Sequence, residues 1–265
     1  TDLLQVEPSA SSGGQLASVD TMVLLLAVAN AFHQRQSTTA RHFQRDGAVY
    51  IPNFLDEPAF EEVRRECRRL RSQLKREKNS VANGRLGRVL DRSSTSHATL
   101  MGPAMSLRLQ SLLSLPTLLE PSEYPVELRH YPQGSGMQWH QDDLLYTEPQ
   151  CEFVLTLENG SDSHTEWVDR KQEVQSIWTE PNSVIVLRAG EEGPLHRVTP
   201  IRRGERSILK FVYTTTNEKT ADFYDHIGSF PGFKQSRLAS QARGERGARS
   251  GGKAARSGRQ SRRGG

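Results

Sequence analysis

The second half of the chain alternates apolar and polar residues with a period of two, which is typical of half-buried β-strands. From Tyr124 onwards this pattern recurs in short segments that are separated by turn residues such as Gly, Asn and Pro. Many short strands without helices between them predict a jelly roll or a barrel, and they exclude a parallel βα sheet. The segments are PVELRHY, MQWHQDDLLY, CEFVLTLEN, TEWVDR, EVQSIWT, SVIVLRA, LHRVTP and ERSILKFVYTT.

The first half of the chain predicts one strand and two helices. A strand is indicated around residues 48–53, after the turn at Asp46 and Gly47. Residues 56–78 begin with a capping aspartate and carry apolar residues at helical spacing, so they predict one long amphipathic helix. Residues 79–103 are rich in Ser, Gly and Asn and predict loops, and residues 104–115 predict a second helix. The predicted fold class is mainly β with flanking helices, a double-stranded β-helix.

Composition and charge divide the chain into three parts. Residues 1–40 are predicted to be a leader, residues 41–230 a folded domain, and residues 231–265 a disordered tail rich in Arg and Gly. The formal net charge of +4 hides a contrast, because residues 234–265 contain ten Lys and Arg and one acid. The preceding part is mildly acidic, so the basic balance does not indicate a folded nucleic-acid-binding domain. The tail itself predicts either a weak contact with RNA or an anionic surface, or a solvated extension without a partner.

The run from Met22 to Ala31 is the most apolar stretch of the chain. It is too short to span a bilayer, which needs about 20 apolar residues, so no membrane span is predicted. Its Ala-Asn-Ala end resembles a secretory cleavage site, and a secretory or organelle-targeting leader is therefore an alternative to a buried helical turn. The sequence leaves the compartment open.

Two of the eight histidines lie two positions before a carboxylate, in the pairs His140/Asp142 and His164/Glu166. Residues i and i+2 of a strand project to the same face, so either pair can present an imidazole and a carboxylate to one ion. A third, distant histidine would complete the two-histidine, one-carboxylate set that binds iron(II) and leaves coordination positions open. Dinucleotide-binding, P-loop, serine-hydrolase and zinc-protease motifs are absent from the sequence.

The sequence around the first pair, His140/Asp142, favours a metal site more than the sequence around the second pair does. His140 lies in a predicted strand after a glycine-containing turn, and His196 begins another short strand further along the chain. Arg206 follows ten residues after His196, and a hairpin between these two strands would place both side chains on one face, about 5 Å apart at Cβ. A guanidinium in that position can hold the distal carboxylate of an acid bound to the metal.

The stretch from Leu128 to Tyr213 resembles the iron(II)/2-oxoglutarate dioxygenase superfamily, most closely its prolyl 4-hydroxylase type. RHYPQGSGMQWHQDD resembles the tyrosine, the glycine turn and the H-x-D segment of that family, and SHTEW resembles one of its barrel strands. EPNSVIVL and LHRVTPIRRGERSILKF resemble the distal-histidine region, and GAVYIPNFLD resembles an opening strand. The resemblance covers about two thirds of the chain.

This resemblance implies a function and a set of site residues. His140, Asp142 and His196 fall on the metal ligands, Arg206 on the cation that grips 2-oxoglutarate, and Tyr131 on a tyrosine that binds the same carboxylate. Prolyl 4-hydroxylases often have lysine at the position of Arg206, so Lys210, on the same strand face, is the fallback cation. The implied cofactors are Fe(2+) and 2-oxoglutarate, with L-ascorbate (vitamin C) as an optional addition. The implied reaction hydroxylates a C–H bond of a peptidyl, for example prolyl, or small-molecule substrate and releases succinate and CO2.

Three alternatives remain open from the sequence. The first is a non-catalytic jelly-roll module that presents the tail to RNA. The second is a metal-binding cupin of isomerase or storage type, which would not need Arg206. The third concerns the ligand set alone and replaces His140/Asp142 with His164/Glu166, although the approach to that pair is rich in turn residues.

Overall fold

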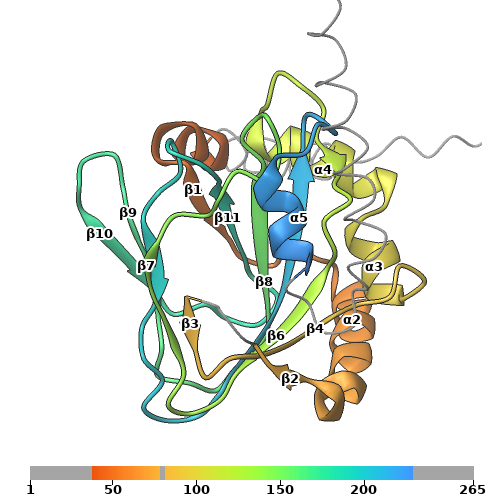
Figure 1. Cartoon of the computed structure of the whole chain (residues 1–265), viewed down its shortest axis with the longest axis vertical. Coiled ribbons are helices and arrows are strands. Elements are labelled where there is room, and N and C mark those ends of the chain that lie inside the picture. Colours follow the sequence, from red (N-terminus) through yellow and green to blue (C-terminus); the bar gives the residue numbers. More distant parts are fainter. Residues whose placement is uncertain (1–37, 78–80, 229–265) are drawn as a thin grey trace, which may run out of the picture.

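The structure is a computed structural model and describes residues 38–77 and 81–228. Within these residues the chain forms two antiparallel sheets that face each other, with helices on one side (Figure 1). The Met22–Ala31 run and the basic tail lie outside the described residues, so the structure tests neither prediction. No helix in the described part of the chain is long and apolar enough to cross a membrane.

The larger sheet has eight strands in the order β1-β11-β8-β13-β6-β4-β2, and β5 pairs with the far end of β13. Its central strands, β8 and β13, are the longest in the fold and are buried along almost their whole length. The strands are β1 (Ala48–Ile51), β2 (Lys75–Arg76), β4 (Leu86–Val89), β5 (Glu120–Pro121), β6 (Glu127–Tyr131), β8 (Cys151–Asn159), β11 (Val184–Arg188) and β13 (Arg206–Thr214).

The smaller sheet has five strands in the order β10-β9-β12-β7-β3. Its strands are β3 (Ala82–Asn83), β7 (Gly136–His140), β9 (Thr165–Val168), β10 (Val174–Ile177) and β12 (His196–Val198). The mainly β fold with flanking helices that the period-two pattern predicts is confirmed, and each of the eight predicted segments after Tyr124 contains a strand.

The helices cover the outer face of the larger sheet (Figure 1). They are α2 (Glu57–Leu70), α3 (Thr95–Leu100) and α4 (Pro103–Leu113), and residues 38–46 are also helical. Asp56 caps α2, since its carboxylate accepts a hydrogen bond from the Ala59 amide. Phe60, Val63 and Cys67 of α2 enter the main apolar core together with strand residues such as Phe153. This arrangement leaves the inner face of the larger sheet directed toward the smaller sheet.

Two predictions about the first half of the chain are wrong. Helix α2 ends at Leu70 instead of continuing to residue 78, because the chain turns through a short 3-10 helix (Arg71–Gln73) and then pairs with β4 as β2. Residues 79–103 are not only loops, since they contain β3, β4 and α3. Polar strands of two to four residues carry too short a pattern for a period to be detected.

Helix α5 (Ala221–Gly228) is the last element of the described chain and follows β13. Phe223 and Ile227 of this helix pack in a separate small core with Tyr124, Tyr146 and Val212. His226 of α5 also lies 2.9 Å from a carboxylate oxygen of Asp143. The loop that follows β7 is thereby fixed to the last described helix.

Candidate metal centre and anion site

Two histidines from neighbouring strands of the smaller sheet face each other. His140, the last residue of β7, and His196, the first residue of β12, are cross-strand partners, and their ring centroids are 4.2 Å apart. Asp142 lies two residues beyond the end of β7, in a loop and not in the longer strand that the sequence predicts. One ligand atom from each of the three side chains lies within 4.8 Å of the others. The structure therefore brings together the three residues that the sequence analysis selects.

Hydrogen bonds fix the orientation of both imidazoles. The Nδ1 atom of His140 lies 2.9 Å from the carbonyl oxygen of Gln138, and the Nδ1 atom of His196 lies 3.1 Å from that of Pro194. A carbonyl oxygen can only accept, so each Nδ1 carries a proton, and in the neutral ring the lone pair is then on Nε2. Both Nε2 atoms face Asp142, at 3.9 Å for His140 and 3.4 Å for His196. Burial and the neighbouring His196 also lower the pKa of His140, which favours the neutral, ligating form.

A buried ion pair lies next to Asp142. Lys210 of β13 is in direct contact with Glu152 of β8, and its Nζ is 3.7 Å from Oδ1 of Asp142. Burial opposes ionisation of Asp142, but Lys210 and the two histidines outweigh it and hold the pKa of Asp142 below its usual range. Burial and the Asp142 charge raise the pKa of Glu152 above its ordinary value, whereas Lys210 opposes this rise. The aspartate is thus kept as the anion that a cation can bind.

Arg206 lies in the same pocket, but the predicted hairpin with His196 is wrong. Strand β12 pairs with β7 and β9 in the smaller sheet, whereas β13 pairs with β5, β6 and β8 in the larger sheet. Arg206 therefore faces His196 across the space between the sheets, and its cross-strand partner is Tyr131 of β6. Both lie on the inner wall of a pocket that also contains the histidines and Asp142.

The guanidinium of Arg206 is buried without a carboxylate partner among the described residues. Its side chain is 1% exposed, and Nη1 donates a hydrogen bond of 2.8 Å to the Thr165 hydroxyl. Its Nε is also buried and has no hydrogen-bond partner. Burial lowers the pKa of Arg206 to about 10, a direction that reflects the cost of burying an uncompensated charge. A buried guanidinium without a compensating charge favours the binding of an anion.

Lys210, the fallback cation, is in a different electrostatic state. Burial disfavours its charge, but Glu152 and Asp142 raise its pKa, so the ammonium is already compensated by two carboxylates. A buried cation that is paired in this way has little attraction left for a further anion. Between the two cations, the geometry favours Arg206 as the anion-binding group.

The hydroxyl of Tyr131 lies beside this cation and receives a hydrogen bond from a second arginine. Nη1 of Arg85 donates to the Tyr131 oxygen at 2.8 Å, and Arg85 forms an ion pair of 2.6 Å with Glu77. Tyr131 is 1% exposed and Arg85 is 4% exposed, so this contact is shielded from solvent.

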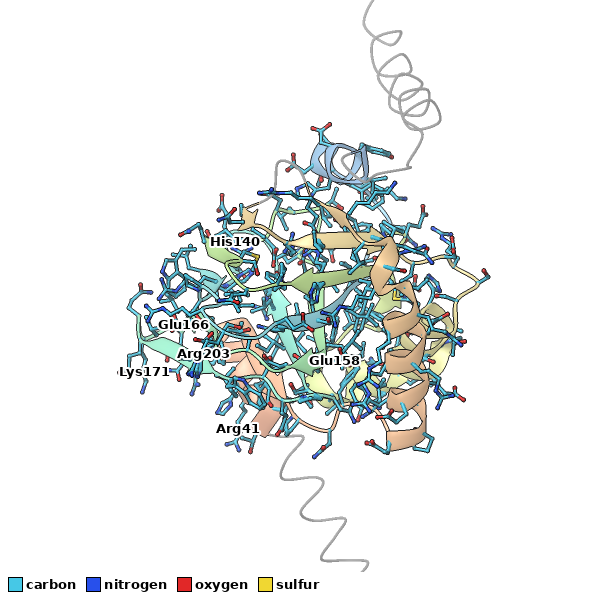
Figure 2. All side chains as sticks on the ribbon, turned by 90° about the horizontal axis from the view of Figure 1, so that it is seen from below. Arg41, His140, Glu158, Glu166, Lys171 and Arg203 are labelled. Carbon is cyan, nitrogen blue, oxygen red and sulfur yellow. The ribbon has the colours of Figure 1, made fainter. Side chains whose placement is uncertain are left out.

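The alternative pair does not form a ligand set. Glu166 forms an ion pair of 2.7 Å with Arg197 and accepts a hydrogen bond from Ser176. In the part of the chain that the structure describes, His140, Asp142 and His196 form the cluster that meets the geometry of a metal site, and His164 and Glu166 belong to none. Figure 2 shows Glu166 and His140 on the side of the smaller sheet, with Glu158 on the side next to α2.

Sequence reasoning missed four residues that surround the site. Thr165 anchors Arg206, Glu152 pairs with Lys210, Arg85 contacts Tyr131, and Arg129 lines the pocket next to Glu127. One signal was present for Glu152, since it lies near the start of the otherwise apolar strand CEFVLTLEN, and a carboxylate is almost never fully buried without a partner.

Comparisons with known proteins find similar solved structures and no match by sequence. No family model matches the chain, and no curated protein matches it. A prolyl-4-hydroxylase from Pseudomonas putida is similar in structure, with a TM-score of 0.55 and 18% identity over 68% of this chain and 99% of that one. A prolyl hydroxylase from Trichoplax adhaerens, in complex with a hypoxia inducible factor peptide fragment, gives a TM-score of 0.57 and 14% identity over 71% of this chain and 93% of that one.

A third similar structure is an epimerase of nogalamycin biosynthesis in complex with Fe3+, alpha-ketoglutarate and nogalamycin RO. It gives a TM-score of 0.58 and 13% identity over 75% of this chain and 91% of that one. Identities this low establish a common fold. The chain has the double-stranded β-helix fold of the iron(II)/2-oxoglutarate oxygenases.

Proposed function

We propose that this chain is an iron(II)- and 2-oxoglutarate-dependent dioxygenase that hydroxylates a C–H bond of its substrate. The observation that carries the proposal is one pocket with two complementary ends. His140, Asp142 and His196 converge at one end, and the guanidinium of Arg206 lies at the other without a carboxylate partner among the described residues.

The residues present fit iron(II). Two neutral imidazoles and one carboxylate are a donor set that binds this ion and leaves positions open for other ligands. The hydrogen bonds from Nδ1 of His140 and His196 to backbone carbonyls are the outer contacts that such a set needs to hold its lone pairs in place. When bound, the metal supplies oxygen activation coupled to decarboxylation of 2-oxoglutarate, with succinate, CO2 and a hydroxylated product.

The residues also fit 2-oxoglutarate. This acid chelates a metal with its 2-oxo carboxylate end and needs a cation at the other end. Arg206 offers its unpartnered Nε, and Thr165 already accepts from Nη1, so the Thr165 hydroxyl hydrogen is left to donate. With the Tyr131 hydroxyl, these groups form a buried set of donors in which a carboxylate is bound strongly, since hydrogen bonds to ionised groups are the strong ones.

The class of substrate is peptidyl, for example prolyl, or a small molecule. Among the similar structures, one contains a peptide fragment and another contains nogalamycin RO, so the fold accommodates both classes. L-ascorbate remains an optional addition that follows from the family resemblance alone. The alternative of an idle module that presents an RNA-binding tail has no support from the described residues, because the tail lies outside them.

The experiment measures succinate released from 2-oxoglutarate by the full chain with Fe(2+), with and without a chelator. We expect iron-dependent release even without the native substrate, because the residues proposed to hold iron and 2-oxoglutarate are already in place in the pocket. A matched pair of variants separates the roles, with Asp142→Ala abolishing release and Asp143→Ala retaining it. A folded, iron-loaded protein that consumes no 2-oxoglutarate would contradict the proposal.

A further inference from the structure

We infer that Arg85 is a positioning residue that directs the hydroxyl proton of Tyr131 into the pocket, so that Tyr131 can donate it to the bound 2-oxoglutarate. The inference rests on the proposed function and adds to it a residue that neither the motif pattern nor the fold comparison indicates. It is carried by the contacts between Arg85, Tyr131 and Glu77.

Arg85 lies where the chain passes from one sheet to the other. Strand β3 pairs with β7 of the smaller sheet, and β4 pairs with β6 of the larger sheet. Gly84 between them has φ +71°, a left-handed conformation that glycine adopts without strain, and it allows this abrupt change of sheet. Arg85 consequently enters the interior beside the end of β6, where Tyr131 lies.

Two contacts on each side hold the guanidinium. Toward β2, its Nε and Nη2 donate to one carboxylate oxygen of Glu77 at 2.9 and 2.6 Å. Toward the pocket, its Nη1 donates to the Tyr131 oxygen at 2.8 Å and to the Met137 sulfur at 3.5 Å. Its carbon Cζ also lies 5.5 Å from the centroid of the Tyr131 ring. An arginine held by a carboxylate on one side has little freedom to leave the phenol on the other.

The direction of the hydrogen bond has a consequence for Tyr131. Arginine has no acceptor, so in this pair the phenol oxygen must accept, and its own proton points elsewhere. The contact recorded for that proton is a weak one, to the Met137 sulfur at 3.8 Å. The opposing residue across the ladder is Arg206, which marks where an anionic carboxylate would lie. A carboxylate there is a far stronger acceptor than a thioether, so the proton is available to it.

The test is a double-mutant cycle on the full chain with Arg85→Gln, Tyr131→Phe and the double variant. The readouts are the KM for 2-oxoglutarate, kcat, and 2-oxoglutarate binding to the Mn(2+)-loaded protein by calorimetry. We expect each single variant to raise KM and the dissociation constant by about 10-fold to 100-fold, the value of one hydrogen bond to a charged group, with kcat nearly unchanged. The double variant should be no worse than Tyr131→Phe, because both changes remove the same donor.

Two further variants distinguish a positioning role of Arg85 from a purely structural effect of its replacement. Arg85→Lys keeps the charge beside Glu77 and one donor for Tyr131, so its KM should lie between those of the wild type and Arg85→Gln. If Arg85→Gln does not fold, a KM of Arg85→Lys above that of the wild type tests the inference alone. Arg188→Gln is the matched control, since Arg188 also pairs with a glutamate and lies 5.2 Å from a ring centroid, that of Phe43, outside the pocket. It should bind 2-oxoglutarate as the wild type does.

The outcomes are distinguishable. If the wild type binds 2-oxoglutarate and Arg85→Gln or Arg85→Lys binds it equally well, the inference is overturned and the proposed function stands. The inference would also be overturned if the fold-increases in the dissociation constant of the two single variants multiplied in the double variant. That result would mean that Arg85 acts independently of Tyr131. If the wild type itself binds no 2-oxoglutarate, both the proposed function and the inference fail.

Discussion

Arg206 and Tyr131 lie directly opposite each other in the antiparallel ladder between β13 and β6. Directly opposed residues of such a ladder point to the same face of the sheet, so the guanidinium and the phenol share the inner wall of the pocket. The two histidines reach that pocket from the other sheet. The two histidines proposed as metal ligands and the Arg206–Tyr131 pair proposed to bind the anion therefore come from opposite walls of the double-stranded β-helix, and a small diacid between them would contact both.

Removal of the Arg206 charge should weaken the binding of 2-oxoglutarate and leave the binding of metal unchanged. In Arg206→Gln the affinity of the Mn(2+)-loaded protein for 2-oxoglutarate should fall about 100-fold, because a charge-assisted contact is lost in a buried site. Calorimetry measures the affinity. Arg203→Gln is the control, since Arg203 is exposed. If Arg206→Gln binds as the wild type does and Lys210→Met does not, the two cations have been assigned the wrong way round.

Asp142 should determine whether the protein responds to divalent metal. Binding to the native state alone raises the melting temperature, so Mn(2+) or Fe(2+) under anaerobic conditions should stabilise the wild type and not Asp142→Ala. The adjacent Asp143→Ala keeps the cluster intact and removes only the hydrogen bond with His226. Its melting temperature should still rise with metal. An equal response of Asp142→Ala and the wild type would exclude this ligand set.

Lys210 should stabilise the metal-free protein through its contacts with the carboxylates of Asp142 and Glu152. Lys210→Met leaves Asp142 and Glu152 buried together without a cation, and loss of one partner from a buried pair costs about 3–5 kcal/mol. Urea denaturation of the metal-free protein measures this cost. The double variant Lys210→Met/Glu152→Gln should recover most of the lost free energy of unfolding, because one of the two uncompensated charges is gone. Additive losses in the double variant would show that the pair acts through packing alone.

Glu66 should give a measurable pH dependence of stability away from the site. Its carboxylate accepts hydrogen bonds from the Thr95 and Ser96 amides and from the Ser96 hydroxyl at the start of α3. Partial burial opposes ionisation, but these donors lower the pKa of Glu66 below its ordinary value of 4.5. A lowered carboxylate pKa adds stability above the unfolded-state value, and that stability is lost as the pH falls through the folded-state value.

Glu66→Gln should consequently lower the free energy of unfolding at pH 7 by about 1 kcal/mol. The difference from the wild type should shrink below pH 4.5, where the wild type also becomes protonated. Chemical denaturation at several pH values measures it. Glu62→Gln on the exposed side of α2 is the control and should change stability little at any pH. A difference that stays constant with pH would contradict the role given to the Glu66 charge.

The sequence predicts the strands and the ligand cluster because both leave local patterns. Short apolar runs between turn residues mark β8, β11 and β13, and the spacing of His140 and Asp142 places these two side chains beside each other whether or not Asp142 lies on the strand. The partner of Arg206 could not be predicted in the same way. Which sheet a strand joins depends on long-range pairing, and His196 and Arg206 belong to different sheets although only ten residues separate them.

Arg85 illustrates a second limit. The segment that carries it consists of very short, polar strands, and its burial results from the change of sheet at Gly84, which no periodicity signals. Side chains that position other side chains, such as Arg85 and Thr165, become visible only when their contacts are known. The three candidate ligands, in contrast, are predicted from residue type and spacing together with the family resemblance.

The proposed site is tested most directly by an anomalous difference map from crystals grown anaerobically with Mn(2+) and 2-oxoglutarate. We expect one metal peak about 2–2.5 Å from Nε2 of His140, Nε2 of His196 and a carboxylate oxygen of Asp142. We also expect 2-oxoglutarate with its distal carboxylate on Arg206. A metal peak at any other cluster, or 2-oxoglutarate bound away from Arg206 while the three ligands stay empty, would contradict the proposed site.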